Sequence, residues 1–244
     1  MTKLYTIDNK LIFDEPDLTL KEAVEKHKDK LEKANLVGAD LRGINLSGAN
    51  LKDAFLQNTN LKGVNLEKAN LCGADLKCTH LENAFLYKAN LIRTNLTYAH
   101  LECANLFDVA LLSSCLYTSN LRDTNLEDAD LTSADLTNAF LYKANLKGAN
   151  LERAILFRAS LEGANLEGVN LEGAKLSGAN LEDTILDKKQ ITQDLFYLFG
   201  DDESKSTEVL EKYGIAKFDA TAITKLAFDL SKQLSKIVKE SEWI

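Results

Sequence analysis

Histidine and cysteine are the residue types in this chain whose spacing is relevant to metal chemistry. His80 and His100 are twenty residues apart, and Cys78 and Tyr98 each stand two residues before one of them. Imidazole and thiolate are common zinc ligands, and a closed structural zinc site needs four ligands. The sequence does not assure a third or fourth ligand. We therefore interpret the two histidines as outward polar residues and predict no metal site.

No other motif indicates catalysis or a cofactor. The carboxylates are scattered, and no Ser/His/Asp arrangement or glycine-rich phosphate loop stands apart from the rest of the sequence. The cysteines match no zinc-binding spacing, and we expect free thiols at Cys72, Cys78, Cys103 and Cys115. The sequence therefore predicts a protein that is not an enzyme and that uses no cofactor.

The element that positions every side chain is a strict repeat of five residues. Leucine occupies every fifth position from Leu31 to Leu186, which makes thirty-two leucines without a gap. On an α-helix this spacing gives no stripe, because each step rotates roughly 140° around the axis. On a β-strand it alternates between the two faces. To keep all the leucines in one core, the chain must turn once in every five residues.

The residue two positions before each leucine is as restricted as the leucine itself. From Ala34 to Thr184 it is alanine at 20 of 31 sites, and it is never charged. In extended backbone these two residues share the inward side, and the residue between them faces outward. That outward residue is Asn sixteen times and Asp four times. Glycine is frequent two residues after the leucine, where we expect it to ease a tight corner.

This A(N/D)LxG pattern, seen at Ala49-Asn50-Leu51 and Ala149-Asn150-Leu151, resembles the pentapeptide-repeat family. The resemblance covers residues 31–186, about two-thirds of the chain. It implies an all-β solenoid, a right-handed four-sided β-helix with twenty residues per coil, whereas periodicity alone also allows three sides. The array would then make about eight coils, spaced about 4.8 Å apart in a rod roughly 38 Å long. In such a rod His80 and His100 stack on adjacent coils.

Both ends of such a rod need covering, and the flanking residues are suited to that role. We expect an N-terminal cap over residues 1–30, the β-helix over 31–187 and a helical segment over 188–244. Within the cap, residues 4–7 and 11–13 read as a hairpin. Thr19 and Glu22 have the spacing of a capping box and open a helix of about ten residues that ends near Lys30. The helix residues expected to face the first coil are Leu20, Ala23, Val24 and His27.

The C-terminal segment loses the period of five and becomes helical in pattern. Its last helix carries apolar residues three and four positions apart, and the expected contact residues are Ile223, Leu226, Leu230, Leu234 and Ile237. One helix shields one end of a rod, and this segment holds more apolar surface than a cap needs. It is either a monomeric cap or an element that forms a homodimer end to end, and dimerisation is our hypothesis.

Outward positions become apolar in the middle of the array, at Phe85, Tyr87, Ile92, Tyr98, Phe107, Leu112 and Tyr117. Tyr87 and Phe107 are twenty residues apart, and so are Ile92 and Leu112. The two residues of each pair are expected to stack, and the two pairs lie on different corners. Clustered exposed aromatic side chains are typical of interfaces, whereas stacked ladders stabilise coils without a partner. We keep both interpretations, and the functional one is a protein-binding face.

Charge and composition limit the remaining function classes. The whole chain has a net charge of −8 and no basic stripe, which argues against direct nucleic-acid binding. No apolar run approaches the 18 residues of a membrane span, and the N-terminus lacks the core of a signal peptide. The sequence therefore predicts a cytoplasmic, non-enzymatic scaffold or protein–protein interaction protein, whose partner it does not name.

The resemblance suggests one alternative function. Some pentapeptide-repeat proteins are similar to a DNA duplex in shape and charge, and they bind type II topoisomerases such as gyrase. Residues 31–186 carry 19 acidic and 14 basic side chains, a net charge of −5, and their register never breaks to admit a loop. A duplex of the same length carries about 22 negative charges. A DNA-mimicking gyrase modulator is therefore the alternative to a scaffold.

Deleting residues 188–244 should convert a dimer into a monomer, because the apolar residues of the last helix are lost. The molar mass of the full chain and of the truncated chain, measured by light scattering, tests this expectation. If both proteins have the mass of a single chain, the dimerisation hypothesis is wrong.

Overall fold

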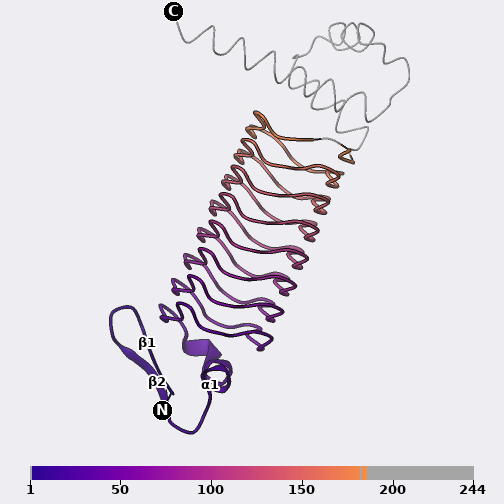
Figure 1. Ribbon diagram of the computed structural model, residues 1–244. Helices are drawn as coiled ribbons and strands as arrows, with labels where there is room; N and C mark the ends of the chain where they lie inside the picture. Colours follow the sequence, from indigo (N-terminus) through magenta and orange to yellow (C-terminus); the bar gives the residue numbers. More distant parts are fainter. Residues whose placement is uncertain (1, 182, 186–244) are drawn as a thin grey trace, which may run out of the picture.

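The repeat folds as a rod of stacked coils, with the N-terminal elements at one end (Figure 1). The computed structural model describes residues 2–181 and 183–185. Parallel bridges join each residue that precedes a leucine to the residue twenty positions later, from Asn35↔Phe55 to Asn165↔Ile185. Four repeats of five residues therefore complete each coil, which fits four sides and excludes three.

Each corner of a coil is a turn that contains a residue with left-handed backbone. The residue two positions after the leucine has a positive φ, for example 67° at Gly38, 57° at Arg93 and 54° at Asp183. The turn is closed by a backbone hydrogen bond such as Ala39 N to Leu36 O, 3.0 Å. Because left-handed backbone costs roughly 1–2 kcal/mol for a residue with a Cβ, glycine is favoured here. The tight corner predicted at this position is confirmed.

Leucine and the small residue two positions before it fill the interior. The leucines of the repeat from Leu31 to Leu166 are at most 2% exposed, and the small residues from Ala34 to Val169 are buried except for Ala39, which is partly buried. Where the small residue is polar, its hydroxyl donates to a backbone carbonyl, as Thr79 Oγ1 does to Leu56 O at 2.9 Å. Each buried leucine contributes about 1.5–3 kcal/mol relative to exposure. The inward orientation predicted for both positions is confirmed.

Backbone hydrogen bonds hold each coil to the next. Between two typical neighbouring repeats, Leu101 N donates to Asn120 O at 2.8 Å, Cys103 N donates to Arg122 O at 3.0 Å, and Asn120 N donates to Ala99 O at 2.9 Å. These bonds join residues 19 or 21 positions apart, so the register of the whole rod is set by the backbone.

The N-terminal cap consists of a hairpin and one helix. Strand β1 (Thr2–Tyr5) pairs antiparallel with β2 (Leu11–Glu15), and the hairpin extends onto the first coil through the bridge Thr6↔Ala34. This bridge covers part of the sheet edge that the first coil leaves open. The predicted hairpin is therefore present, and it pairs directly with the rod.

Helix α1 spans Leu20–Lys26 and begins with the predicted capping box of Thr19 and Glu22. The helix is shorter than the expected ten residues, since a 3₁₀ turn over Lys28–Lys30 follows it. His27 follows the last residue of α1. Its ring stacks on Phe13 at 5.0 Å between centroids, and its Nε2 lies 2.6 Å from Glu15 Oε1. The α1 residues that pack against the core are fully buried Ala23 and Val24 and partly buried Leu20.

Burial decreases toward the other end of the described rod. Leu171, Leu176 and Leu181 are only partly buried, unlike the leucines before them. The expected helical segment over 188–244 lies outside the described residues. So do the residues of the dimerisation hypothesis, Ile223, Leu226, Leu230, Leu234 and Ile237. Among the described residues, no helix is long and apolar enough to cross a membrane.

Replacing Leu126 with alanine should destabilise the rod by about 2–5 kcal/mol, because Leu126 is fully buried and its removal leaves a cavity. Urea denaturation followed by circular dichroism measures the change. Lys77→Ala is the matched control, since Lys77 is exposed and substitutions at such positions usually change stability by less than about 0.5 kcal/mol. Equal effects of the two substitutions would contradict the assignment of the leucines to the core.

Candidate functional site

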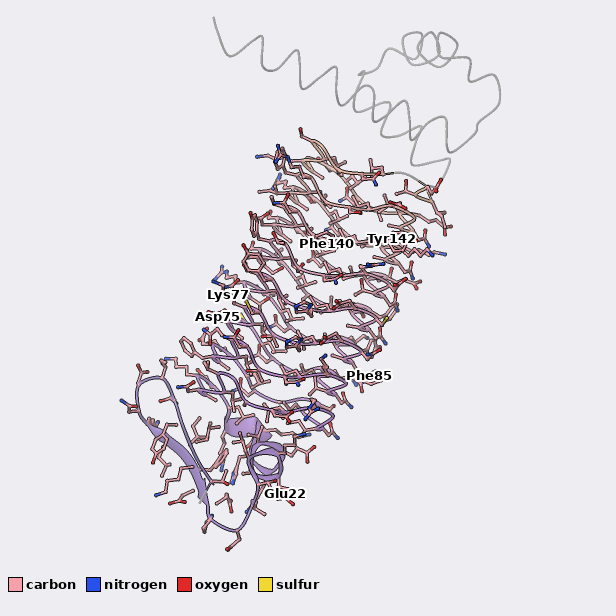
Figure 2. All side chains as sticks on the ribbon, in the orientation of Figure 1. Glu22, Asp75, Lys77, Phe85, Phe140 and Tyr142 are labelled. Atoms are coloured by element: carbon pink, nitrogen blue, oxygen red, sulfur yellow. The ribbon has the colours of Figure 1, made fainter. Side chains whose placement is uncertain are left out.

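Every outward residue is assigned to one of the four sides of the rod. A row of bridged residues, which we call a ladder, runs along each side, and we number the sides by these ladders. These ladders are, in chain order, Asn70–Asn90–Ala110, Asp75–Asn95–Cys115, His80–His100–Asn120 and Phe85–Asn105–Asn125. A residue that follows a leucine projects from the same side as the ladder residue that precedes that leucine. Thr97, for example, follows Leu96, and its Oγ1 lies 3.3 Å from Sγ of the ladder residue Cys115 on the adjacent coil. Figure 2 accordingly places Asp75 and Phe85, on the second and fourth sides, at opposite edges of the rod.

Asparagine has a structural role at the ladder positions. Asn105 Oδ1 accepts a hydrogen bond from the backbone N–H of Phe107 at 3.2 Å, a group that is not used between coils. The amide nitrogen is also used, since Asn145 Nδ2 donates to Asn125 Oδ1 at 3.2 Å along the fourth side. The asparagines of the ladders therefore support the fold. Residues that replace them give up these bonds and are the better candidates for function.

The seven apolar residues singled out from the sequence do not form one flat face. Phe85, Tyr87 and Phe107 belong to the fourth side, and Ile92 and Leu112 to the first side. The second side carries Tyr98 and Tyr117. Since these three sides follow one another around the coil, the residues form a band that leaves out the third side. We call these seven residues the apolar band.

Two kinds of residue make up the apolar band. Tyr87 and Phe107 are half-buried and stacked, with ring centroids 5.6 Å apart and planes at 19°. Tyr98 and Tyr117 meet edge to face at 6.0 Å. Phe85 is 55% exposed and Tyr98 is 46% exposed. The ladder interpretation therefore suits the Tyr87–Phe107 pair, whereas Phe85 and Tyr98 offer apolar surface to solvent.

Further aromatic residues lie on the rod outside the apolar band. Phe140 and Tyr142, on the third side, lie farther from the N-terminal cap than Phe85 (Figure 2). The Tyr142 ring is contacted by the cations of Arg122, at 5.1 Å, and Lys143, at 5.0 Å. Phe157 on the second side is also exposed. These residues occupy the same outward positions of the repeat as the apolar band, but the sequence prediction was limited to residues 85–117.

The two histidines stack as predicted, on the third side. The centroids of the His80 and His100 rings are 4.9 Å apart, and the ring planes differ by 9°. Their neighbours are carboxylates: His80 Nδ1 lies 3.2 Å from Glu82 Oε1, and His100 Nδ1 lies 3.5 Å from Glu102 Oε1. The donor atoms of Glu82, His100 and Glu102 all lie within 4.8 Å of one another, and neither Cys78 nor Tyr98 belongs to this group.

These two carboxylates were missed in the sequence, although a signal existed. His80-Leu81-Glu82 is repeated twenty residues later as His100-Leu101-Glu102. Burial by itself raises the pKa of Glu82, but hydrogen bonds from Lys62, the backbone and His80 outweigh it, so the pKa lies below its ordinary value. Lys62 Nζ is 2.9 Å from Glu82 Oε1. Glu82 is therefore an ionised carboxylate at neutral pH.

The four cysteines are free thiols, as predicted from their positions. Cys103 is exposed and the other three are partly buried.

Coils of twenty residues, with leucine inside and asparagine ladders outside, define a solenoid of the pentapeptide-repeat type. The family model described as pentapeptide repeats, eight copies, matches residues 30–63, 39–77, 74–111, 114–153 and 154–188. The chain belongs to the pentapeptide-repeat family.

Solved structures similar to this chain are also pentapeptide-repeat proteins. HetL from the cyanobacterium Nostoc sp., involved in heterocyst differentiation regulation, is 37% identical, with a TM-score of 0.51 over 63% of this chain and 68% of HetL. QnrB1, a plasmid-mediated fluoroquinolone resistance protein, is 18% identical, with a TM-score of 0.44 over 68% of this chain and 85% of QnrB1. A comparison with curated protein sequences gives no match.

The stacked pair of the apolar band should show energetic coupling. In a double-mutant cycle with Tyr87→Ala and Phe107→Ala, we expect a coupling free energy of about 0.5–1.5 kcal/mol, because ring stacking adds to simple burial. Urea denaturation of the two single variants and the double variant gives this value. Tyr87→Ala combined with Phe140→Ala is the control and should be additive, since these rings lie on different sides. Additivity in both cycles would show that the Tyr87–Phe107 ladder does not stabilise the coils.

Proposed function

We propose that the protein is a non-enzymatic scaffold that binds a protein partner through the apolar band. The observation that carries this proposal is Phe85, an exposed phenyl group at a ladder position where Asn65 and Asn105 occupy the adjacent coils. The leucines and small residues are committed to the core. Function is therefore sought among outward residues that depart from the repeat.

Phenylalanine at position 85 has a cost for the isolated rod. An asparagine there would accept the backbone N–H of residue 87, as Asn105 does for residue 107, and a phenyl ring offers no such acceptor. A hydrogen bond of this kind contributes about 0.5–1.5 kcal/mol. Burying the exposed 55% of the ring against a partner would return roughly half of the 1.5–3 kcal/mol that full burial of such a side chain contributes. The residue choice thus favours a ring that becomes buried on binding.

The surroundings of Phe85 also suit an interface. Tyr87 and Phe107 supply further aromatic surface on the same side, and Lys88 borders it, with Nζ 5.2 Å from the Tyr87 ring centroid and 3.4 Å from Asp108 Oδ2. An apolar centre with charged residues at the margin is the usual arrangement of a protein–protein contact. Tyr98, on the second side, extends the apolar band around the rod.

Similarity to HetL supports a role exercised through contacts. HetL is described as involved in the regulation of differentiation, and its identity with this chain is 37%. Pentapeptide-repeat proteins are generally structural or interaction proteins rather than enzymes. Both points support the class of function, and neither identifies the partner.

The distribution of charge argues against the DNA-mimicking alternative. Several acidic side chains pair with basic ones, as in Lys88–Asp108 at 3.4 Å and Lys147–Glu167 at 3.2 Å. A duplex instead presents unpaired negative charges along its whole length. We therefore prefer the scaffold over a gyrase modulator.

Replacing Phe85 and Tyr98 together with asparagine should abolish partner binding and leave the rod folded. Asparagine is the usual ladder residue at position 85, and it tolerates the left-handed backbone at Tyr98, where φ is 58°. Affinity capture from the source cells with quantitative mass spectrometry identifies partners, and titration with the purified partner then gives affinities. We expect at least about a tenfold loss of affinity, equivalent to 1.4 kcal/mol or more.

Phe140→Asn is the matched control, because Phe140 is a similarly exposed ring at a ladder position outside the apolar band. It should bind like the unmodified protein. Partner binding that survives the double substitution, or that is lost equally in the control, would refute the role of the apolar band.

A further inference from the structure

We propose that the third side of the rod holds a divalent transition-metal site, suited to zinc, formed by His80, Glu82, His100 and Glu102. This inference is independent of the partner-binding proposal. It concerns a different side of the rod and a different chemistry. The repeated His-Leu-Glu tripeptide places the four side chains together, because residues twenty positions apart occupy adjacent coils.

The donor atoms are already gathered. The ligand atoms of Glu82, His100 and Glu102 lie within 4.8 Å of one another, and His80 Nδ1 lies 3.2 Å from Glu82 Oε1. Two ligand atoms on one zinc ion are separated by at most about 4.2 Å, twice the usual metal–ligand distance. Side-chain rotations therefore bring these three donors into a coordination sphere. His80 lies outside the group of three, stacked on His100, and has to turn toward the ion to supply the fourth donor.

Unsatisfied oxygens provide an independent observation. In the part of the chain that the structure describes, three buried side-chain atoms lack a hydrogen-bond partner, and two of them are Glu82 Oε2 and Glu102 Oε2. A buried acceptor without a partner costs about 1–3 kcal/mol, and more when it is charged. A bound cation would satisfy both oxygens and offset the repulsion between the two carboxylates.

The other oxygen of each carboxylate is already held by the protein. Lys62 Nζ donates to Glu82 Oε1 at 2.9 Å, and Asn120 Nδ2 donates to Glu102 Oε1. Such outer hydrogen bonds orient the ligands of a metal site. Lys62 also places a positive charge beside the site, so it lowers the affinity for a cation. Lys62→Gln should therefore strengthen binding.

The donor set selects the kind of ion. Two imidazoles and two carboxylates suit zinc and similar transition metals, whereas magnesium and calcium prefer oxygen ligands alone. The site is also confined to two coils. On the third side the ladder neighbours are Asn60 and Asn120, and the neighbouring positions after leucine carry Lys62 and Arg122.

Isothermal titration of the full chain with zinc chloride tests the proposal. We expect one ion per chain, and at least about a tenfold loss of affinity in the double variant His80→Asn/His100→Asn and in Glu82→Gln/Glu102→Gln. The asparagine variant restores the common ladder residue between Asn60 and Asn120 and should therefore fold, which its circular dichroism without zinc will verify. Magnesium chloride should give no binding at the same concentrations.

The four free thiols need a separate control, because cysteine also binds zinc. The variant Cys72→Ser/Cys78→Ser/Cys103→Ser/Cys115→Ser should bind zinc as the unmodified chain does. Cobalt(II) bound in place of zinc should show no thiolate charge-transfer absorption. The proposal fails if the unmodified chain binds no zinc at micromolar concentration, if both double variants bind it unchanged, or if the serine variant abolishes binding.

Discussion

Backbone hydrogen bonding between coils is the interaction on which the rest of this structure depends. In a repeat such as that of Leu121, three of the five N–H groups bond to neighbouring coils, one closes the corner turn, and the fifth bonds to the outward Asn120. Because buried backbone groups need partners, this pattern restricts the side chains as well. Leucine and a small residue fill the inside, a left-handed residue makes the corner, and asparagine completes the bonding outside.

This pattern separates residues that support the fold from residues free to do something else. An exposed phenyl at Phe85, or the His80–His100 pair, replaces a structurally useful asparagine without improving the backbone bonding. The Tyr87–Phe107 stack shows that departures from the repeat can also be structural, since neighbouring coils bring like residues into contact. A departure therefore becomes a candidate for function only after its contacts with the next coil are known. Phe85 and the His/Glu group meet that condition, one through exposure and the other through unsatisfied oxygens.

Sequence reasoning succeeded where burial follows a local period. The inward leucines, the corner residues and the Thr19 capping box were all predicted, because each depends on residues within five positions of one another. The expected helix of about ten residues is instead α1, of seven residues, followed by a 3₁₀ turn that ends at Lys30. At the junction His27 contacts Phe13 and Glu15, and no local pattern reveals these contacts. The apolar residues were predicted to stack as two pairs on different corners, and the structure distributes all seven over three sides. Glu82 and Glu102 were overlooked although each stands two residues after a histidine, because the group of Glu82, His100 and Glu102 forms only across two coils.

The sequence by itself determined which side chains point inward and where the chain turns, because every leucine of an unbroken period of five is buried only if the chain turns once in each repeat. Only the tertiary structure decided which outward side chains meet. That choice depends on the number of sides, seen in bridges between residues twenty positions apart, and on the rotamers that neighbouring coils allow. The stacked pair His80 and His100 thereby shares a surface with two glutamates, and seven apolar residues extend around the rod.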